Sequence, residues 1–308
     1  MYDSHISHVR EKLADIPDGC LEESFTILPG LTLTFQDYLT DQVSCLHDAR
    51  PGFLEINYCR YGRAGWNMKD GTSLYLGSGD FCIHTQTLCA GSVMTLPGGH
   101  YEGLSVCMEL SAFDRNLPEL LTGTGITASS LSGKFCPDGT CFSLTGSEHT
   151  EPIFSGFFDL EQPFQKPYFF LKTMELLLYL GRLPILPDAK KQGYPSEQVE
   201  VVRKIHEYLL KHMEQRITID ELSRQYLINP TTLKTVFKAV YGDSLASHMK
   251  EHRMERAAAL LLQTDQSVSQ IARAVGYESA SRFSAAFRDT YQALPLEYRK
   301  KHQETNFS

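Results

Sequence analysis

The spacing of hydrophobic residues changes along the chain and divides it into parts with different predicted structures. Between residues 25 and 110, short runs rich in aromatic and β-branched residues are separated by Gly, Asp and Pro at near-regular intervals. FLEINYCRY, DFCIHTQT and YEGLSVCMEL are examples of these runs. The pattern predicts a β-barrel or β-sandwich. From Ser196 onward the apolar residues recur at helical spacing, which predicts an all-α region.

Residues 111–183 lie between these regions and predict helices. LSAFDRNLPELL and EPIFSGFFDLEQ indicate short helices, and a longer one is expected from about Pro167 to Leu183. This longer helix is apolar around most of its circumference, so its own domain or a partner subunit must cover it. PILPDAKKQGYP, residues 184–195, contains three prolines and predicts a linker. The predicted fold class is α+β with two domains, residues 1–183 and 196–308, joined by 184–195.

The helical region contains a pattern that predicts a helix-turn-helix. Thr218 and Glu221 form a capping box at the start of a short helix, DELSRQYL. Asn229 is a good N-cap and Pro230 a good first residue for the next helix, TTLKTVFKAVYG. Two short helices across a tight turn, each with a narrow apolar face, are typical of this motif.

The same pattern recurs about 49 residues later, so two helix-turn-helix motifs are predicted. Ser267 and Gln270 form the second capping box, and Phe283 takes the place of Leu233. A helix from about Ser247 to Thr264 joins the motifs and would span roughly 27 Å. This is somewhat less than the ~34 Å between successive major grooves on one DNA face. The second helix of each motif is therefore expected to enter adjacent grooves of a bent duplex, or of a straight duplex given the offset of these helices from the linking helix.

Net charge separates the two predicted domains. The whole chain has a formal net charge of −8, but residues 1–195 carry 13 Lys and Arg against 23 Asp and Glu. Residues 196–308 carry 16 against 14, a net charge of +2, which suggests two functions on one chain.

The start of the chain has no apolar signal region and no stretch reaches membrane length, so the expected location is the cytoplasm. All eight cysteines lie in residues 1–141 without a CxxC pair, which indicates reduced structural thiols.

The last hundred residues resemble the DNA-binding domain of the AraC/XylS family of transcriptional regulators. The resemblance includes the R-x-x-x-A-x-x-L-L form of the linking helix and several residues of the second motif and of the segment that follows it. The matching residues are Arg253, Ala257, Leu260, Leu261, Ile271, Ala272, Val275, Gly276, Tyr277, Phe283, Phe287, Pro295, Tyr298 and Arg299. The resemblance implies a sequence-specific regulator, an activator in our interpretation, that is not an enzyme and needs no cofactor. Its implied partners are a double-stranded DNA operator and RNA polymerase.

DNA contacts are expected on the outward faces of the second helix of each motif. The candidate DNA-binding residues are Thr231, Thr232, Lys234, Thr235, Lys238, Ser281, Arg282, Ser284, Ala285 and Arg288. The resemblance places Thr231, Lys234 and Thr235 at base-reading positions. Arg299 is a further candidate for phosphate contact. Because Thr235 and Ala285 are small, thymine methyl contacts and DNA shape are expected to supplement direct base recognition.

The N-terminal part resembles the cupin-like effector-binding domain that many family members carry, on the phrases YLGSGDFCIHT and LPGGHYEGLSV. This implies a cupin-like barrel that binds a small-molecule effector in an aromatic-lined pocket. Candidate lining residues are Tyr58, Tyr61, Trp66, Tyr75, Phe81, His84, His100 and Tyr101. Dimerisation of the chain as a homodimer through the helix Tyr168–Leu183 is also expected.

Two other function classes stay open at the level of the sequence. A cupin-type metal enzyme normally needs two closely spaced histidines, a glutamate and a later histidine, whereas only His84, His100 and Glu102 are available. Cys82, His84 and Cys89 do not have a standard zinc spacing, and no metal ligand set is assigned. A methyl-accepting DNA-repair regulator would need a reactive cysteine, and no cysteine has an evident activating neighbour.

Overall fold

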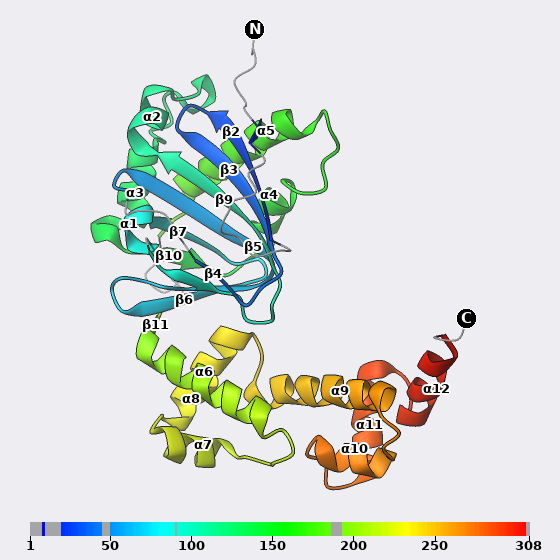
Figure 1. The fold of residues 1–308 in the computed structure, drawn as a ribbon. Coiled ribbons are helices and arrows are strands. Elements are labelled where there is room, and N and C mark those ends of the chain that lie inside the picture. The colour runs from blue at the N-terminus through cyan, green and yellow to red at the C-terminus, as the bar shows by residue number, and fades with distance from the viewer. Residues whose placement is uncertain (1–7, 10–19, 45–49, 90, 186–192, 306–308) are drawn as a thin grey trace. The chain divides into compact units, whose positions relative to one another are not determined.

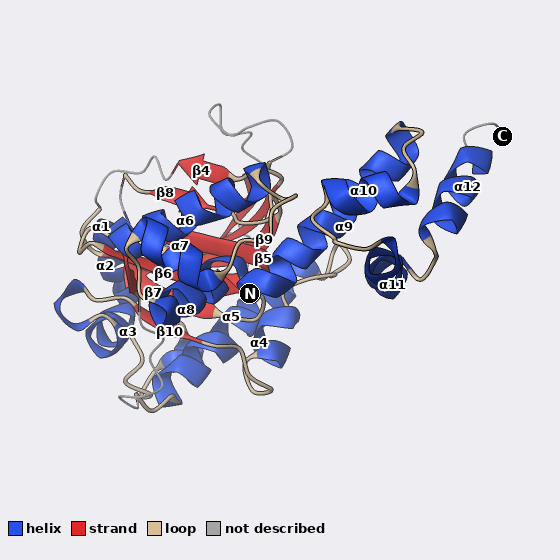
Figure 2. Cartoon of the chain, turned by 90° about the horizontal axis from the view of Figure 1, so that it is seen from below, coloured by secondary structure: helices blue, strands red, loops and turns tan. Residues whose placement is uncertain are grey.

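The computed structural model describes residues 8–9, 20–44, 50–89, 91–185 and 193–305 (Figure 1). The chain divides into two compact units, Met1–Ser196 and Glu197–Ser308. Within the described ranges, strands occur in the first unit and the second unit is built of helices (Figure 2). The predicted α+β organisation, with a sheet-rich N-terminal part and a helical C-terminal part, is therefore confirmed. None of the described helices is both long and apolar enough to cross a membrane.

The first unit is organised around antiparallel strands. Its strands are β1 (His8–Val9), β2 (Leu21–Leu28), β3 (Leu31–Tyr38), β4 (Gln42–Ser44), β5 (Phe53–Asn67), β6 (Thr72–Gly77), β7 (Phe81–Thr85), β8 (Val93–Thr95), β9 (Tyr101–Glu109), β10 (Phe142–Leu144) and β11 (Tyr194–Pro195). Residues 186–192 of the predicted linker lie outside the described residues. The end of that segment is β11, which pairs with the edge of β6.

Strand β5 connects two groups of strands. Its first half, from Phe53, pairs with β9 and β7, and its second half, ending at Asn67, pairs with β6 and β8. The register with β9 shifts between Cys59 and Tyr61, an irregularity of the kind that bends a strand. One long strand therefore belongs to both groups.

The strand pairings do not close into the predicted barrel. Among the described residues, the hydrogen-bonded order is β1-β2-β3-β9-β5-β6-β11, and β7, β10, β8 and β4 branch from it. The two ends of this path do not pair with each other, so the sheet is open. The sequence predicted alternating strands, which the structure contains, but closure depends on pairings between distant segments that alternation does not specify.

Helices cover one face of the sheet. They are α2 (Leu110–Arg115), α3 (Ala128–Phe135), α4 (Glu151–Ser155) and α5 (Gln165–Arg182), with 3₁₀ turns η1 (Glu119–Leu121) and η2 (Pro137–Gly139). The short helix α1 (Gln86–Cys89) instead buries Leu88 and Cys89 in the opposite core. Alternate residues of the central strands, such as Ile56 and Val106, pack with Phe113, Phe135 and Phe154 from the helices. Figure 1 shows α2 to α5 along this side of the sheet. The helices bury the apolar side chains of this face, and burial of apolar surface is the dominant favourable contribution to folding.

The opposite face of the strands forms a second core. Tyr38, Cys59 and Tyr101 from one strand group pack with Trp66 and Leu76 from the other group. Side chains therefore fill the space between the two strand groups around the bend of β5.

The second unit contains seven helices in its described range. They are α6 (Ser196–Lys211), α7 (Ile219–Tyr226), α8 (Pro230–Tyr241), α9 (Leu245–Gln263), α10 (Val268–Ala274), α11 (Ala280–Tyr291) and α12 (Pro295–Thr305). Both predicted capping boxes are present, at Thr218 before α7 and at Ser267 before α10. In each, the side chain at N3 accepts from the N-cap backbone, so donors at the start of the helix are satisfied. The pairs α7–α8 and α10–α11 are the two helix-turn-helix motifs.

The two turns use the same left-handed backbone conformation with different residues. Gly276 has φ of +79° after α10, and Leu227 has φ of +53° after α7. A Cβ at Gly276 would lie 2.5 Å from the Met213 carbonyl oxygen, so glycine is also required by close packing. Leu227 is 93% exposed and carries the strain of a left-handed residue without burying its side chain.

Two arginines occupy equivalent places in the repeat. Arg253 on α9 donates to the carbonyls of Met213 and Gln215, which follow α6. Arg299 on α12 donates in the same way to carbonyls at the end of α9 and beyond it. Each arginine binds backbone carbonyls at the end of a helix or in the turn that follows it. The repeated unit is thus a helix, a helix-turn-helix and a closing helix, with α9 shared by both copies.

Candidate functional site

Helix α8 presents a polar face on the first helix-turn-helix. Asn229 Oδ1 accepts the N–H of Thr231 at 2.8 Å, and Pro230 is the first helical residue. The side chains of Leu233, Val236, Phe237 and Val240 are buried. Of the predicted DNA-binding residues on this helix, four are exposed and Thr232 is half-buried; the exposed ones are Thr231, Lys234, Thr235 and Lys238. The sequence placed these side chains on the outward face, and the structure does the same.

Helix α11 has the equivalent arrangement in the second motif. Ser279 caps it by accepting the N–H of Arg282 at 3.3 Å, and Phe283 and Phe287 are buried. Of the predicted residues on this helix, Ser284 is half-buried and the others are exposed; these are Ser281, Arg282, Ala285 and Arg288. Phe283 and Phe287 pack with Met254, Ala257 and Leu261 of α9. The shared helix α9 therefore supports the second motif directly.

The cations on these faces are available to an anionic partner. Helix α8 carries Lys234 and Lys238 and no acidic residue, and α11 carries Arg282 and Arg288 with one aspartate. None of the described residues forms an ion pair with any of these four cations. Exposed Lys and Arg side chains without a protein partner are suited to contact DNA phosphates.

The eight predicted effector-lining residues are distributed over several environments. Tyr58 and Phe81 pack in the core under the helices, where the Tyr58 ring stacks on Phe154 at 4.2 Å. Trp66 and Tyr101 lie in the core between the strand groups, and Tyr75 and His84 are also buried. Tyr61 is exposed, and its ring lies 4.8 Å from that of His100. These residues are therefore divided between the two cores and the surface.

His84 uses both ring nitrogens in hydrogen bonds. Nε2 lies 2.9 Å from Asn57 Nδ2, which must donate, and Nδ1 lies 3.1 Å from the Thr85 carbonyl, to which it donates. Glu55, His84 and Cys89 have ligand atoms within 4.8 Å of one another. Because Asn57 takes the single lone pair of this imidazole, the ring is poorly placed to ligate a metal.

The cysteine thiols that show a perturbed acidity favour the protonated form. A hydrogen bond with Cys141, together with burial, raises the pKa of Cys82 well above its usual value. Burial, with Glu55 nearby, raises the pKa of Cys107 to about 12. A reactive cysteine needs a lowered pKa, so neither thiol has the electrostatics of a nucleophile.

Comparison with known proteins finds a family match within the second unit and relatives that align over about a third to under half of the chain. A model of a helix-turn-helix domain matches residues 222–301. The regulatory protein PocR of Salmonella typhimurium is 27% identical over 112 residues, 36% of this chain and 37% of PocR. The transcriptional regulator ExsA of Pseudomonas aeruginosa is 30% identical over 137 residues, 44% of this chain and 48% of ExsA. These matches support the resemblance to the AraC/XylS family that the sequence indicated, over the helix-turn-helix region.

A solved structure is similar over the same region. The C-terminal domain of AraT, a response regulator from Geobacillus stearothermophilus, has 32% identity and a TM-score of 0.32, covering 33% of this chain and 84% of that domain. The matched part of the chain spans less than half the length of PocR or ExsA.

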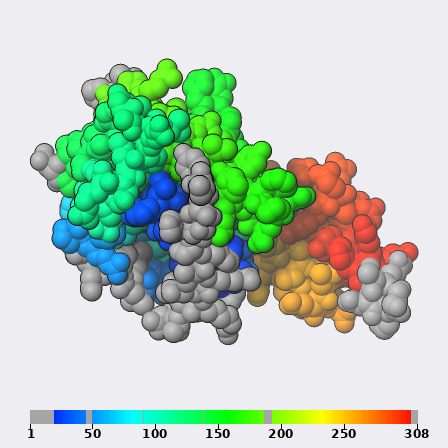
Figure 3. Space-filling model, turned by 90° about the horizontal axis from the view of Figure 1, so that it is seen from above, coloured from blue at the N-terminus to red at the C-terminus, as the bar shows by residue number. Residues whose placement is uncertain are grey.

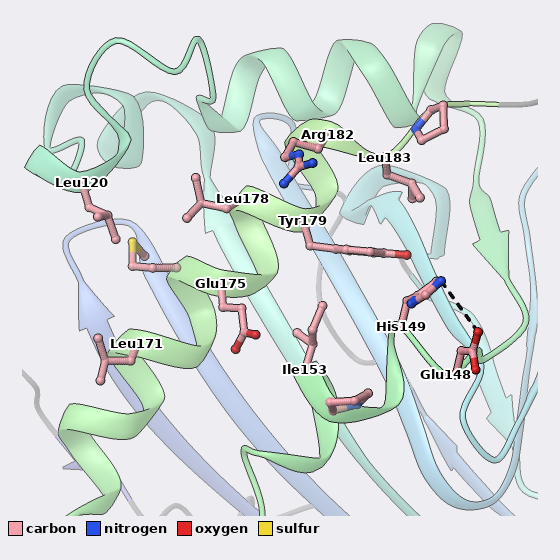
Figure 4. Close-up of a pocket in the computed structure, with 13 residues that line it drawn as sticks. Leu120, Glu148, His149, Ile153, Leu171, Glu175, Leu178, Tyr179, Arg182 and Leu183 are labelled. Carbon is pink, nitrogen blue, oxygen red and sulfur yellow. Dashed lines mark ion pairs between the residues drawn. The ribbon is translucent and has the colours of Figure 1, made fainter.

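The first unit contains a groove along α5 that the sequence did not predict. Figure 4 shows its lining side chains, which enclose a volume of about 840 Å³. Leu171, Met174, Leu178 and Tyr179 contribute one face of α5, whereas Phe169 and Leu177 on the opposite face are buried. The facing wall comes from η1 and from α4 and the turn before it; it is made of Leu120, Glu148, His149, Pro152 and Ile153. The spacing at 171, 174 and 178 is helical and visible in the sequence, but the facing wall comes from segments that only folding brings near.

The structure also assigns a different role to Arg299 from the phosphate contact that the sequence suggested. Its Nε donates to the Leu261 carbonyl at 2.9 Å, and one terminal nitrogen donates to Gln266 at 2.7 Å and Thr264 at 3.3 Å. The side chain is committed to holding the end of α9.

Proposed function

We propose that this chain is a member of the AraC/XylS family and a sequence-specific transcriptional regulator that binds double-stranded DNA through two helix-turn-helix motifs. The observation that supports it is the pair of capped helices α8 and α11, each buried on one face and exposing unpaired cations on the other. Such a helix fits the major groove, where its N-terminal residues meet base edges.

The ten candidate residues divide between bases and phosphates in this proposal. Lys234 lies on the exposed face between buried Leu233 and Val236, so its ammonium can extend to a guanine edge. Arg282 is flanked by short side chains, so we assign it mainly to the backbone together with Lys238 and Arg288. The remaining members supply hydroxyl or methyl contacts; they are Thr231, Thr232, Thr235, Ser281, Ser284 and Ala285.

We assign regulation by a small molecule, and dimerisation, to the first unit. The cupin-like character of this unit and the eight predicted lining residues remain part of the proposal. For the homodimer we propose the groove face of α5, where Leu171 is 56% exposed and Tyr168 is 47% exposed. Residues of α4 and α5 form part of the surface in Figure 3, in green. Apolar side chains at an exposed helix face are typical of subunit interfaces.

The proposal includes no enzymatic activity. The raised pKa values of Cys82 and Cys107 argue against a methyl-accepting thiol at either position, and the hydrogen bonds of His84 argue against a cupin-type metal centre. A regulator of this kind would act in the cytoplasm, with RNA polymerase as its partner in activation.

The test is selection of duplexes by the purified full chain, followed by fluorescence anisotropy on the selected sequence. We expect the logarithm of the association constant to fall linearly with the logarithm of salt, by about 0.9 per phosphate contact. Lys234→Ala should weaken binding to the selected duplex, whereas Lys204→Ala, an exposed lysine on α6, should not. A chain that enriches no sequence and binds no duplex at low salt would refute the proposal.

A further inference from the structure

Three histidines converge in the second unit. His206 lies on α6, and His248 and His252 lie one turn apart on α9. The Nε2 atom of His248 is 2.9 Å from Nε2 of His206 and 3.1 Å from Nε2 of His252. Histidines at i and i+4 share one face of a helix, a spacing that recurs in zinc sites. The second helix brings the third ring across a separation of 42 residues.

Hydrogen bonds between the three rings cannot satisfy all of the nitrogen atoms that face one another. Glu255 Oε2 lies 3.2 Å from Nδ1 of His252, so Nδ1 donates its proton there and Nε2 carries the lone pair. Nε2 of His248 faces two nitrogens, although it holds either one proton or one lone pair. Its single proton would have to serve both neighbours at once. A cation at the centre would instead accept a lone pair from each ring.

The surroundings keep His206 and His248 neutral and leave all three rings partly accessible. Burial, together with the neighbouring imidazoles, lowers the pKa of both His206 and His248 to about 4, so both are uncharged near neutral pH. The Tyr241 ring lies 4.2 Å from that of His206 and 4.9 Å from that of His248. All three histidines are only partly buried, which leaves a path for an ion.

We propose that His206, His248 and His252 bind a divalent first-row transition metal ion, with zinc as the best fit. Imidazole nitrogens suit Zn²⁺ and its neighbours in the series, and the second unit contains no cysteine that would select a softer ion. At Zn–N distances of about 2.0–2.1 Å, tetrahedral ligands lie about 3.3–3.4 Å apart. The separations of His248 from His206 and from His252 need to widen by only a few tenths of an ångström to match this, and all three ligand atoms lie within 4.8 Å of one another. Glu255 is a positioning residue, because a carboxylate on the outer nitrogen orients a ligating histidine.

The site would link metal binding to the first helix-turn-helix. Helices α7 and α8 lie in the chain between His206 and His248, so an ion shared by α6 and α9 closes the segment that contains the motif. Phe237 of α8 also contacts the cluster, with its ring 5.5 Å from that of His248. A ligand that binds the folded form stabilises it, so metal occupancy would stabilise this motif. The inference is independent of the DNA-binding proposal, because metal binding is measured without DNA.

The experiment uses the full chain after removal of metal by dialysis against a chelator. Co²⁺ is added as an optical probe, since its absorption distinguishes nitrogen ligands from thiolates, and the affinity for Zn²⁺ is measured by competition. We expect one ion with a spectrum that lacks thiolate charge transfer, and a Zn²⁺-dependent rise in melting temperature. Both should be lost in His206→Gln and His248→Gln and kept in His212→Gln, a control just after α6.

Glu255→Gln keeps the test decisive even if the histidine variants fold poorly. Removing an outer carboxylate typically costs about 10–100-fold in metal affinity, and we expect a loss in that range with an unchanged circular dichroism spectrum. The proposal is overturned if no ion binds, if the spectrum shows thiolate ligands, or if affinity is unchanged in folded His248→Gln or Glu255→Gln.

Discussion

Removal of the Arg299 side chain tests whether the end of α9 is held by this one guanidinium. In Arg299→Ala, three carbonyls lose their donor, namely those of Leu261, Thr264 and Gln266. Hydrogen bonds to a charged group contribute about 1.5–3 kcal/mol each. Because Arg299 is only half-buried, water replaces part of this, and we expect a total loss of about 2–3 kcal/mol in the free energy of unfolding.

Differential scanning calorimetry of the full chain would measure the effect. For a unit of this size about 4 °C accompanies each kcal/mol, so the transition of the second unit should fall by about 8–12 °C. Arg299→Lys should recover a minor part, since a compact ammonium does not match the forked geometry of these acceptors.

Arg288→Ala is the matched control, because it removes an exposed arginine from the same repeat. It should leave the melting temperature nearly unchanged but reduce the salt slope of DNA binding by about one unit. Arg299→Ala should retain the wild-type salt slope at a temperature where the protein is folded. The reasoning is wrong if the two variants melt together, or if Arg299→Ala lowers the salt slope as Arg288→Ala does.

Three other predictions concern recognition, backbone strain and assembly. Lys234→Ala should cost roughly 1–3 kcal/mol at its operator and relax preference at one base pair, whereas Arg282→Ala should weaken all sequences alike. If Lys234→Ala ranks single-base operator variants as the wild type does, it is not a base reader. Leu227→Gly should stabilise the second unit by about 0.5–1 kcal/mol in chemical denaturation, because glycine relieves the left-handed strain at an exposed side chain. A lower stability would show that Leu227 makes contacts that matter. Leu171→Asp should weaken self-association by roughly 100-fold or more in sedimentation, since a buried unpaired carboxylate is costly, and an unchanged oligomeric state would exclude this face.

The second unit was largely predictable from the sequence because its signals are local. The capping boxes at Thr218 and Ser267 and the Asn229-Pro230 start of α8 act within one helical turn. Periodicity then assigned Leu233 and Phe283 to the core, and the exposed candidates followed from their positions on the opposite face.

The first unit shows the limit of local signals. Alternation identified strands, but the bend of β5, its division between two groups of partners and the open ends of the sheet depend on pairings between distant residues. The predicted lining residues were chosen by type, and the strand faces then separated Tyr58 from Trp66. Alternation with a period of two shows that successive side chains point to opposite faces of the sheet, but it does not show which elements pack against each face.

Tertiary structure alone decided which polar groups meet. The pair His248 and His252 is visible as a spacing on one helix, yet His206 joins them only because α6 packs beside α9. The sequence made Arg299 a candidate for phosphate contact, whereas in the folded chain it donates to carbonyls at the end of α9 and in the turn that follows. Capping hydrogen bonds and the periodic burial of side chains depend on residues that are close together in the sequence. The sequence therefore specified the helices and which of their faces are buried. Contacts between helices depend on the packing of whole elements, and so the histidine cluster, the arginine clamps and the α5 groove emerged only in three dimensions.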